Sequence, residues 1–209
     1  MRLRHDSAPF EPAELDMFKQ KFANIPPAPA WAVREYSAGL IGLHEEILDF
    51  CDFMSPPYQE EEMRRDVFQR IEKAIISLWP QAQVRVFGSY LTGLYLPTSD
   101  IDLVVLGHIG YPRNALFNLT NHLRYSRDFI GVRSIPQAKV PIVKLEDLKT
   151  GVKIDISIGN RNGIDNSMVI SSYLAEFSQL RPLTLVLKYF LYQQGLNDPA
   201  YGGLGGYGL

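Results

Sequence analysis

The spacing of the apolar residues changes near residue 80 from helical to extended, and this change restricts the fold more than any other feature. Apolar residues recur at helical spacing over residues 37–54 and 59–79, and proline follows each stretch. From residue 84 onward, short apolar runs of strand type are interspersed with segments of helical period. The sequence therefore predicts an α/β (α+β) fold, with helices packed on a small mixed sheet.

The expected elements can be placed by residue number. Strands are expected at residues 84–87, 101–106, 129–135, 140–145 and 152–158, and helices at 37–54, 59–79, 114–125, 166–177 and 182–194. A loop and a short helix are expected between the first two strands. Residues 1–36 are rich in proline and predict an irregular arm with one short helix near residues 14–22.

The composition excludes several classes of protein. With 46% hydrophobic and 21% charged residues, the chain has the balance of an ordinary folded protein. The formal net charge of -2 gives the whole chain no attraction to phosphate backbones or anionic membranes, and no apolar run is long enough for a membrane span. The single cysteine and four scattered histidines match no zinc spacing. A single cysteine cannot form an intrachain disulfide, and together with the lack of a secretory leader this fits a reducing compartment.

An acid pair stands in the second expected strand, within the run D-I-D-L-V-V. Because side chains alternate between the two faces of a strand, Asp100 and Asp102 share one face while the other face is apolar. Two ionised carboxylates at this separation repel each other, and both are costly on an apolar strand unless a cation lies between them. Oxygen ligands favour Mg²⁺ or Mn²⁺, so the pair predicts a divalent metal site.

A third acid, Asp155, lies in a strand whose apolar residues alternate cleanly. The alternating apolar face consists of Val152, Ile154, Ile156 and Ile158. If this strand lies beside the strand of Asp100 and Asp102, three carboxylates converge. Three carboxylates can hold two metal ions about 3.5 to 4 Å apart, the arrangement used for in-line phosphoryl transfer.

Gly88 and Ser89 end the first expected strand, with ten residues between Ser89 and Asp100. Because glycine has no Cβ, backbone N–H groups and the Ser89 hydroxyl can approach phosphate oxygens here. Each feature alone has a plainer explanation, since Asp-x-Asp is often a strand end that meets solvent and Gly-Ser is often a turn. Their order along the chain favours a nucleotide site.

These residues belong to longer segments that resemble the polymerase β-like nucleotidyltransferases, and within them the noncanonical poly(A) polymerases of the TRAMP type. The resemblance covers about residues 37–209 and rests on HEEILDFCDFMSP (44–56), VFGSYLTGLYLPTSDIDLVVLG (86–107), KVPIVKL (139–145), VKIDISI (152–158) and LVLKYFLYQQGLND (185–198). It implies a nucleotidyltransferase palm at residues 58–164 and a helical central domain, incomplete here, formed by residues 37–57 and 165–209.

The resemblance also implies an activity, which is template-independent transfer of AMP from ATP to an RNA 3′ end. Asp100, Asp102 and Asp155 match the catalytic, metal-binding positions of the family, which imply two Mg²⁺ or Mn²⁺ ions. Gly88 and Ser89 match its phosphate-binding positions.

Three further residues match nucleotide-binding positions by resemblance. Asn166 looks like the residue that contacts the ribose, Lys188 like the triphosphate lysine and Tyr207 like the aromatic that stacks on the base. The plainer alternatives are a helix cap, a solvated lysine and an ordinary core or tail tyrosine. Two positions depart from the family pattern, since Tyr192 replaces a second basic residue and Gly206 replaces a serine.

The resemblance further implies an RNA-binding partner, namely a TRAMP-like zinc-knuckle subunit together with a helicase. The weak net charge fits a catalytic chain whose RNA binding is supplied by such a partner. It implies a nuclear location, with a cytoplasmic one as the alternative. Two other functions stay open: a uridylyltransferase or other nucleotidyltransferase, and a truncated, non-catalytic interaction module. The module stays open because the family continues beyond the segment that ends at Leu209.

Overall fold

The computed structural model describes residues 28–199 and 202–206 of the chain. Contacts divide the chain into two compact units, Met1–Asp49 and Phe50–Leu209. The short helix expected near residues 14–22 and the candidate residue Tyr207 lie outside the described residues. In the part of the chain that the structure describes, no helix combines the length and apolar character needed to cross a bilayer.

In the first unit, the described residues before α2 (Leu40–Met54), which are 28–39, are irregular, as expected. The helix begins three residues later than the expected start at Ser37. The backbone N–H of Ser37 donates to the Glu45 carboxylate at 2.8 Å and its hydroxyl donates at 3.1 Å. Gly39 has a φ of 70°, in the left-handed region, so a continuous right-handed helix cannot pass through it.

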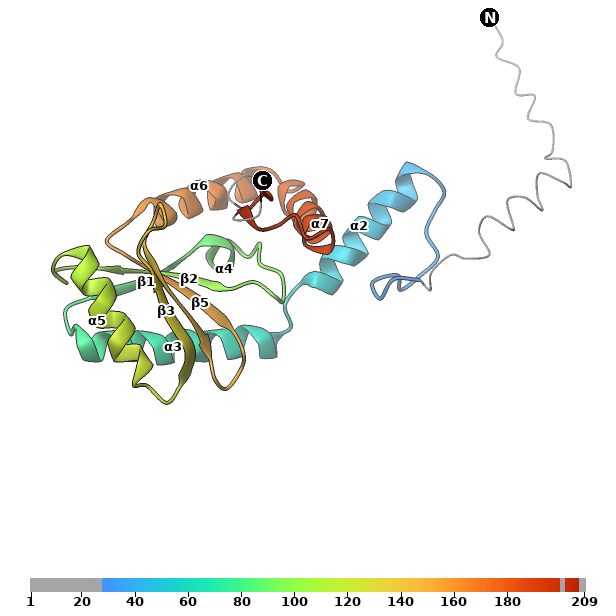
Figure 1. Ribbon diagram of the computed structural model, residues 1–209. Coiled ribbons are helices and arrows are strands. Elements are labelled where there is room, and N and C mark those ends of the chain that lie inside the picture. The colour runs from blue at the N-terminus through green and yellow to red at the C-terminus, as the bar shows by residue number, and fades with distance from the viewer. Residues whose placement is uncertain (1–27, 200–201, 207–209) are drawn as a thin grey trace, which may run out of the picture. The chain divides into compact units, whose positions relative to one another are not determined.

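The described residues of the second unit form one mixed sheet of five strands in the order β1-β2-β5-β4-β3 (Figure 1). The strands are β1 (Gln83–Phe87), β2 (Ile101–Leu106), β3 (Phe129–Ile135), β4 (Ile142–Asp147) and β5 (Lys153–Ile158). Strands β2 and β5 are parallel, and the other neighbouring pairs are antiparallel. The predicted fold class is confirmed, and β2 and β3 have the predicted bounds.

Strand β4 lies two residues later than the predicted 140–145, so that prediction is wrong at both ends. Pro141 has no N–H to donate to a neighbouring strand and stands just outside β4. At the other end, Asp147 pairs with Phe129, which extends the strand past Leu145.

Helices α3 (Tyr58–Leu78) and α5 (Pro112–Arg124) pack on one face of the sheet and form the core (Figure 1). Ile71 of α3, Leu119 of α5 and Ile154 of β5 are fully buried together. Burial of each such side chain contributes about 1.5 to 3 kcal/mol before the loss of chain entropy is counted. The core therefore fixes which face of β2 and β5 is apolar.

Helices α4 (Gly88–Thr92) and α6 (Asn162–Glu176) pack toward the other face, and α7 (Leu180–Gln193) follows. Gly163 lets α6 approach the sheet, because a Cβ there would lie 2.4 Å from the ring of Phe87. Helix α6 begins four residues before the predicted start at 166. The expected short helix is present as α4, and it begins at Gly88, directly after β1, so no loop separates the strand from the helix.

Candidate active site

Three acidic side chains converge where β2 and β5 lie side by side. Asp102 of β2 pairs directly with Asp155 of β5, so their side chains leave the same face of the sheet. One carboxylate oxygen from each of Asp100, Asp102 and Asp155 lies within 4.8 Å of the others. The two strands are thus neighbours, which was the condition for the three carboxylates to meet.

The cluster carries more negative charge than its surroundings neutralise. Burial, and after it the charges of Asp100 and Asp155, raise the pKa of Asp102 to about 7, although Lys144 and Lys188 oppose the rise. The pKa of Asp155 is also raised, by burial first, although a hydrogen bond from Lys144 opposes the rise. An all-oxygen donor set with surplus negative charge fits a hard divalent cation such as Mg²⁺ or Mn²⁺.

Lys144 is a member of this site that sequence reasoning missed. It pairs with Asp155 across β4 and β5, and its Nζ donates to Asp155 Oδ2 at 2.5 Å. Alternation along β4 separates Lys144 from the buried Val143 and Leu145. That signal gives the face, but only the pairing of β4 with β5 shows which acid shares it.

Gly88 allows the close approach of α4 to the acids. Its φ of 69° lies in the left-handed region, and a Cβ there would lie 2.3 Å from Asp102 Oδ2. Its backbone N–H donates to the Ser167 hydroxyl at 2.8 Å. This N–H is therefore bonded within the protein, and Ser89 follows Gly88 in the same helix.

Ser167 was also missed by sequence reasoning. It is only 2% exposed, and its hydroxyl donates to the Gly163 carbonyl at 2.7 Å while accepting from Gly88. One side chain thus joins α6 to the first residue of α4. No local pattern in the sequence distinguishes this serine from its neighbours, because its partner lies 79 residues away.

Lys188 of α7 lies near the acid pair and is partly buried. Its Nζ donates to the Leu94 carbonyl at 2.7 Å, so the alternative of a solvated lysine is wrong. Burial lowers its pKa, and the charges of Asp100 and Asp102 oppose that change. The structure thus brings this candidate residue within electrostatic reach of the acids.

Asn166 lies inside α6, past its first turn, and not at the start of the helix. The capping position before the helix is occupied by Arg161, so the alternative that Asn166 is a helix cap is wrong. The side chain of Asn166 is partly buried, and no hydrogen bond joins it to the carboxylates among the described residues.

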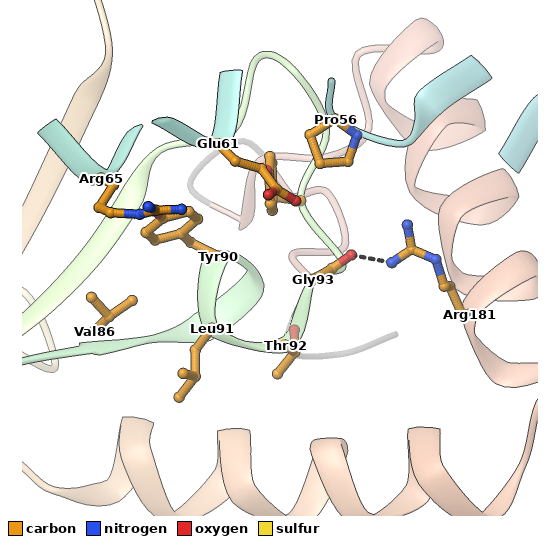
Figure 2. Close-up of a pocket in the computed structure, with 10 residues that line it drawn as sticks. Pro56, Glu61, Arg65, Val86, Tyr90, Leu91, Thr92, Gly93 and Arg181 are labelled. Atoms are coloured by element: carbon orange, nitrogen blue, oxygen red, sulfur yellow. Dashed lines mark hydrogen bonds between the residues drawn. The ribbon is translucent and has the colours of Figure 1, made fainter. Parts of the chain in front are cut away.

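A cavity of about 500 Å³ lies beside the second half of α4, where Tyr90, Leu91 and Thr92 line it, as Figure 2 shows. Its lining consists of Pro56, Glu61, Arg65, Val86, Tyr90, Leu91, Thr92, Gly93, Tyr95 and Arg181. Arg181 donates to the Gly93 carbonyl across this cavity. None of the three acids is among the residues that line this cavity.

Comparison with known families places the site in context. The family described as poly(A) RNA polymerase, mitochondrial-like, central palm domain matches residues 43–175. Poly(A) RNA polymerase protein 2 of Saccharomyces cerevisiae is 40% identical over 166 residues, which are 78% of this chain and 28% of the yeast protein. The chain thus spans little more than a quarter of that curated relative.

Solved structures give the same picture. The polymerase core of TRAMP, an RNA surveillance complex, matches with a TM-score of 0.75 and 36% identity, over 87% of this chain and 58% of that chain. The Cid1 poly(U) polymerase bound to MgGTP matches with a TM-score of 0.71 and 26% identity, over 79% of this chain and 53% of that chain.

Proposed function

Because the chain belongs to the family of mitochondrial-like poly(A) RNA polymerases and has the polymerase β-like nucleotidyltransferase fold, we propose that it transfers AMP from ATP to RNA 3′ ends without a template. The observation that carries the proposal is the convergence of Asp100, Asp102 and Asp155 on one face of neighbouring strands. Pyrophosphate is the other product of this transfer.

The three carboxylates are the metal ligands in this proposal. Asp100 and Asp102 would hold both ions, and Asp155 would complete the coordination of one of them. Mg²⁺ or Mn²⁺ bound there supplies positive charge at the transferred phosphoryl group and lowers the pKa of the attacking hydroxyl. The raised pKa of Asp102 supports this assignment, because a carboxylate that is costly to ionise alone gains most from a bound cation.

The remaining candidate residues act on the nucleotide by position and charge. The Ser89 hydroxyl and the Lys188 ammonium would bind the triphosphate. Lys188 has three N–H donors and spends one on the Leu94 carbonyl, so two remain for phosphate oxygens. By resemblance, Asn166 would contact the ribose and Tyr207 the base. Gly88 would contribute by leaving room for the Asp102 carboxylate.

RNA affinity in this proposal comes largely from a partner protein. The net charge of -2 supports it, because the chain as a whole does not attract RNA. The likeness to the polymerase core of TRAMP supports a complex with a zinc-knuckle subunit and a helicase, acting in the nucleus in RNA processing. Co-purification of tagged chain from nuclear and cytoplasmic fractions tests both the partners and the location.

The activity is tested by extension of a labelled oligo(A) RNA with each nucleoside triphosphate, in Mg²⁺ or in Mn²⁺. The wild type is expected to add AMP from ATP, and the Asp100→Ala, Asp102→Ala double variant is expected to be at least about 10³-fold slower, since metal charge stabilisation is worth several kcal/mol. Asp128→Ala is the matched control, because Asp128 is exposed and lies outside the cluster.

Two outcomes would contradict this function. Tailing by the double variant at the wild-type rate would show that Asp100 and Asp102 are not catalytic. No tailing by a folded wild type that binds Mn²⁺ would favour the interaction module instead.

A second candidate activity is uridylyl transfer. The likeness to the Cid1 poly(U) polymerase favours it, since the two folds agree over most of this chain. Competition between ATP and UTP for the same labelled RNA separates the two activities. Preferential incorporation of UMP would replace adenylyl transfer while leaving the metal site as proposed.

A further inference from the structure

Asp100 differs from the other two acids in what holds it. Asp102 pairs with Phe87 and with Asp155, so sheet hydrogen bonds on both sides fix its backbone. The first paired residue of β2 is Ile101, and Asp100 precedes it. The position of the Asp100 carboxylate therefore depends on the turn before the strand.

That turn is held by a buried arginine on α3. The side chain of Arg64 is only 1% exposed, and its Nη1 and Nη2 donate to the carbonyls of Ser99 and Pro97, each at 3.0 Å. The Ser99 carbonyl belongs to the peptide unit that joins Ser99 to Asp100. The arginine thus grips the backbone directly next to the metal ligand.

The same arginine is itself fixed on its other sides. Its Nε donates to the Glu60 carboxylate at 3.0 Å, and its guanidinium carbon lies 4.7 Å from the centre of the Tyr95 ring. The turn also closes on itself, because the Leu96 N–H donates to the Ser99 hydroxyl at 3.0 Å. A guanidinium held on every side cannot swing away, so it sets one position for the carbonyls it binds.

We propose that Arg64 is a positioning residue for metal binding, acting through the Ser99 and Pro97 carbonyls to hold Asp100 in register with Asp102. The inference rests on the proposed function, since it assumes that Asp100 is a metal ligand. A lysine at this position cannot take over the role, because its single ammonium nitrogen cannot donate to both carbonyls as the two terminal nitrogens of the planar guanidinium do.

The experiment measures Mn²⁺ binding to the chain by electron paramagnetic resonance, without RNA or nucleotide. Arg64→Lys is expected to weaken Mn²⁺ binding by about 10-fold or more, as loss of residues that orient metal ligands generally does. The Mg²⁺ concentration for half-maximal tailing is expected to rise in parallel.

Arg70→Lys is the matched control on the same helix. Its guanidinium binds Asp66 and the buried Asp147, and none of its hydrogen bonds within the described residues reaches the turn before β2. It is expected to lower the melting temperature and to leave Mn²⁺ affinity unchanged. A purely structural Arg64 would behave as Arg70 does, so equal Mn²⁺ affinity in folded Arg64→Lys and wild type would overturn the inference.

A milder variant keeps the test decisive if Arg64→Lys does not fold. Glu60→Gln removes the charge that Arg64 Nε binds and leaves the arginine in place. It is expected to weaken Mn²⁺ binding several-fold, and unchanged binding would count against the inference. Because Mn²⁺ binding needs no RNA, a wild type that binds Mn²⁺ normally and adds no nucleotide would contradict only the proposed function.

Discussion

Two aspartates of the same sheet, Asp147 and Asp102, are withdrawn from solvent in opposite electrostatic settings. Asp147 at the end of β4 is fully buried, and it accepts hydrogen bonds from Arg70 at 2.7 Å and from the N–H and hydroxyl of Thr150. Burial opposes its ionised form, but the bonds from Arg70 and Thr150 outweigh burial and hold its pKa below the usual value. Burial and the two neighbouring carboxylates, Asp100 and Asp155, raise the pKa of Asp102 to about 7.

The difference separates a structural carboxylate from a functional one. The protein supplies Asp147 with its own cation, so the charge contributes to stability and needs nothing from outside. It leaves Asp102 beside Asp100 and Asp155, and among the described residues Lys144 bonds to Asp155 while Lys188 acts on Asp100 and Asp102 through its charge. Charge left uncompensated at this cost is typical of a site that binds a cation.

The largest expected effect is on the structural side of this comparison. Asp147→Ala removes three hydrogen bonds to a buried carboxylate, one from Arg70 and two from Thr150, so the free energy of unfolding is expected to fall by about 3 to 5 kcal/mol. Urea denaturation measures this loss, and the exposed Asp128→Ala is the control, expected within about 0.5 kcal/mol of wild type. Equal urea midpoints for both variants would show that Asp147 is not a structural carboxylate.

The next effect is on the functional side. Gly88→Ala forces a Cβ against the Asp102 carboxylate, and displacement by about 1 Å is expected to reduce tailing about 100-fold. Gly93→Ala is the control at the other end of α4, with a φ of 71° but its nearest neighbour 3.5 Å away at Arg181. Both variants carry left-handed strain of about 1 to 2 kcal/mol, so equal losses of activity would attribute the effect to backbone strain alone.

The third prediction reverses the usual sign of a substitution in a buried site. Folded Asp102 has a pKa of about 7 against an ordinary value of 3.8, so between these values the folded chain binds more protons and loses stability as pH rises. In metal-free buffer, Asp102→Asn is therefore expected to melt several degrees higher than wild type at pH 8, with a smaller gain at pH 5. Melting temperatures measured in EDTA test this prediction. A wild type that melts at a higher temperature than Asp102→Asn at pH 8 would contradict it.

The smallest effect tests the link between α6 and α4. Ser167→Ala removes the acceptor of the Gly88 N–H, which is expected to cost about 1 kcal/mol of stability and to raise the KM for ATP a few-fold. Ser172→Ala is the control, an exposed serine of the same helix that donates to the Val169 carbonyl. An unchanged KM in Ser167→Ala, with stability lost, would leave Ser167 as a packing residue only.

Much of the fold could be predicted because its signals are local. Alternation placed Asp100 and Asp102 on one face, and residues 101–106 form the strand expected from their apolar run. The start of α6 was misplaced because the packing of Gly163 against Phe87 is a tertiary contact. The roles of Lys144 and Ser167 were hidden for the same reason, since each is defined by a partner on another element.

The sequence by itself determined which residues share a face, because alternation along a strand and the helical period are properties of neighbouring residues. It thereby identified the three acids and the glycine beside them. Only the tertiary structure decided that β5 lies between β2 and β4, which brings Asp155 to Asp102 on one side and to Lys144 on the other. Strand order and burial depend on contacts between distant segments, and these set the opposite pKa shifts of Asp102 and Asp147.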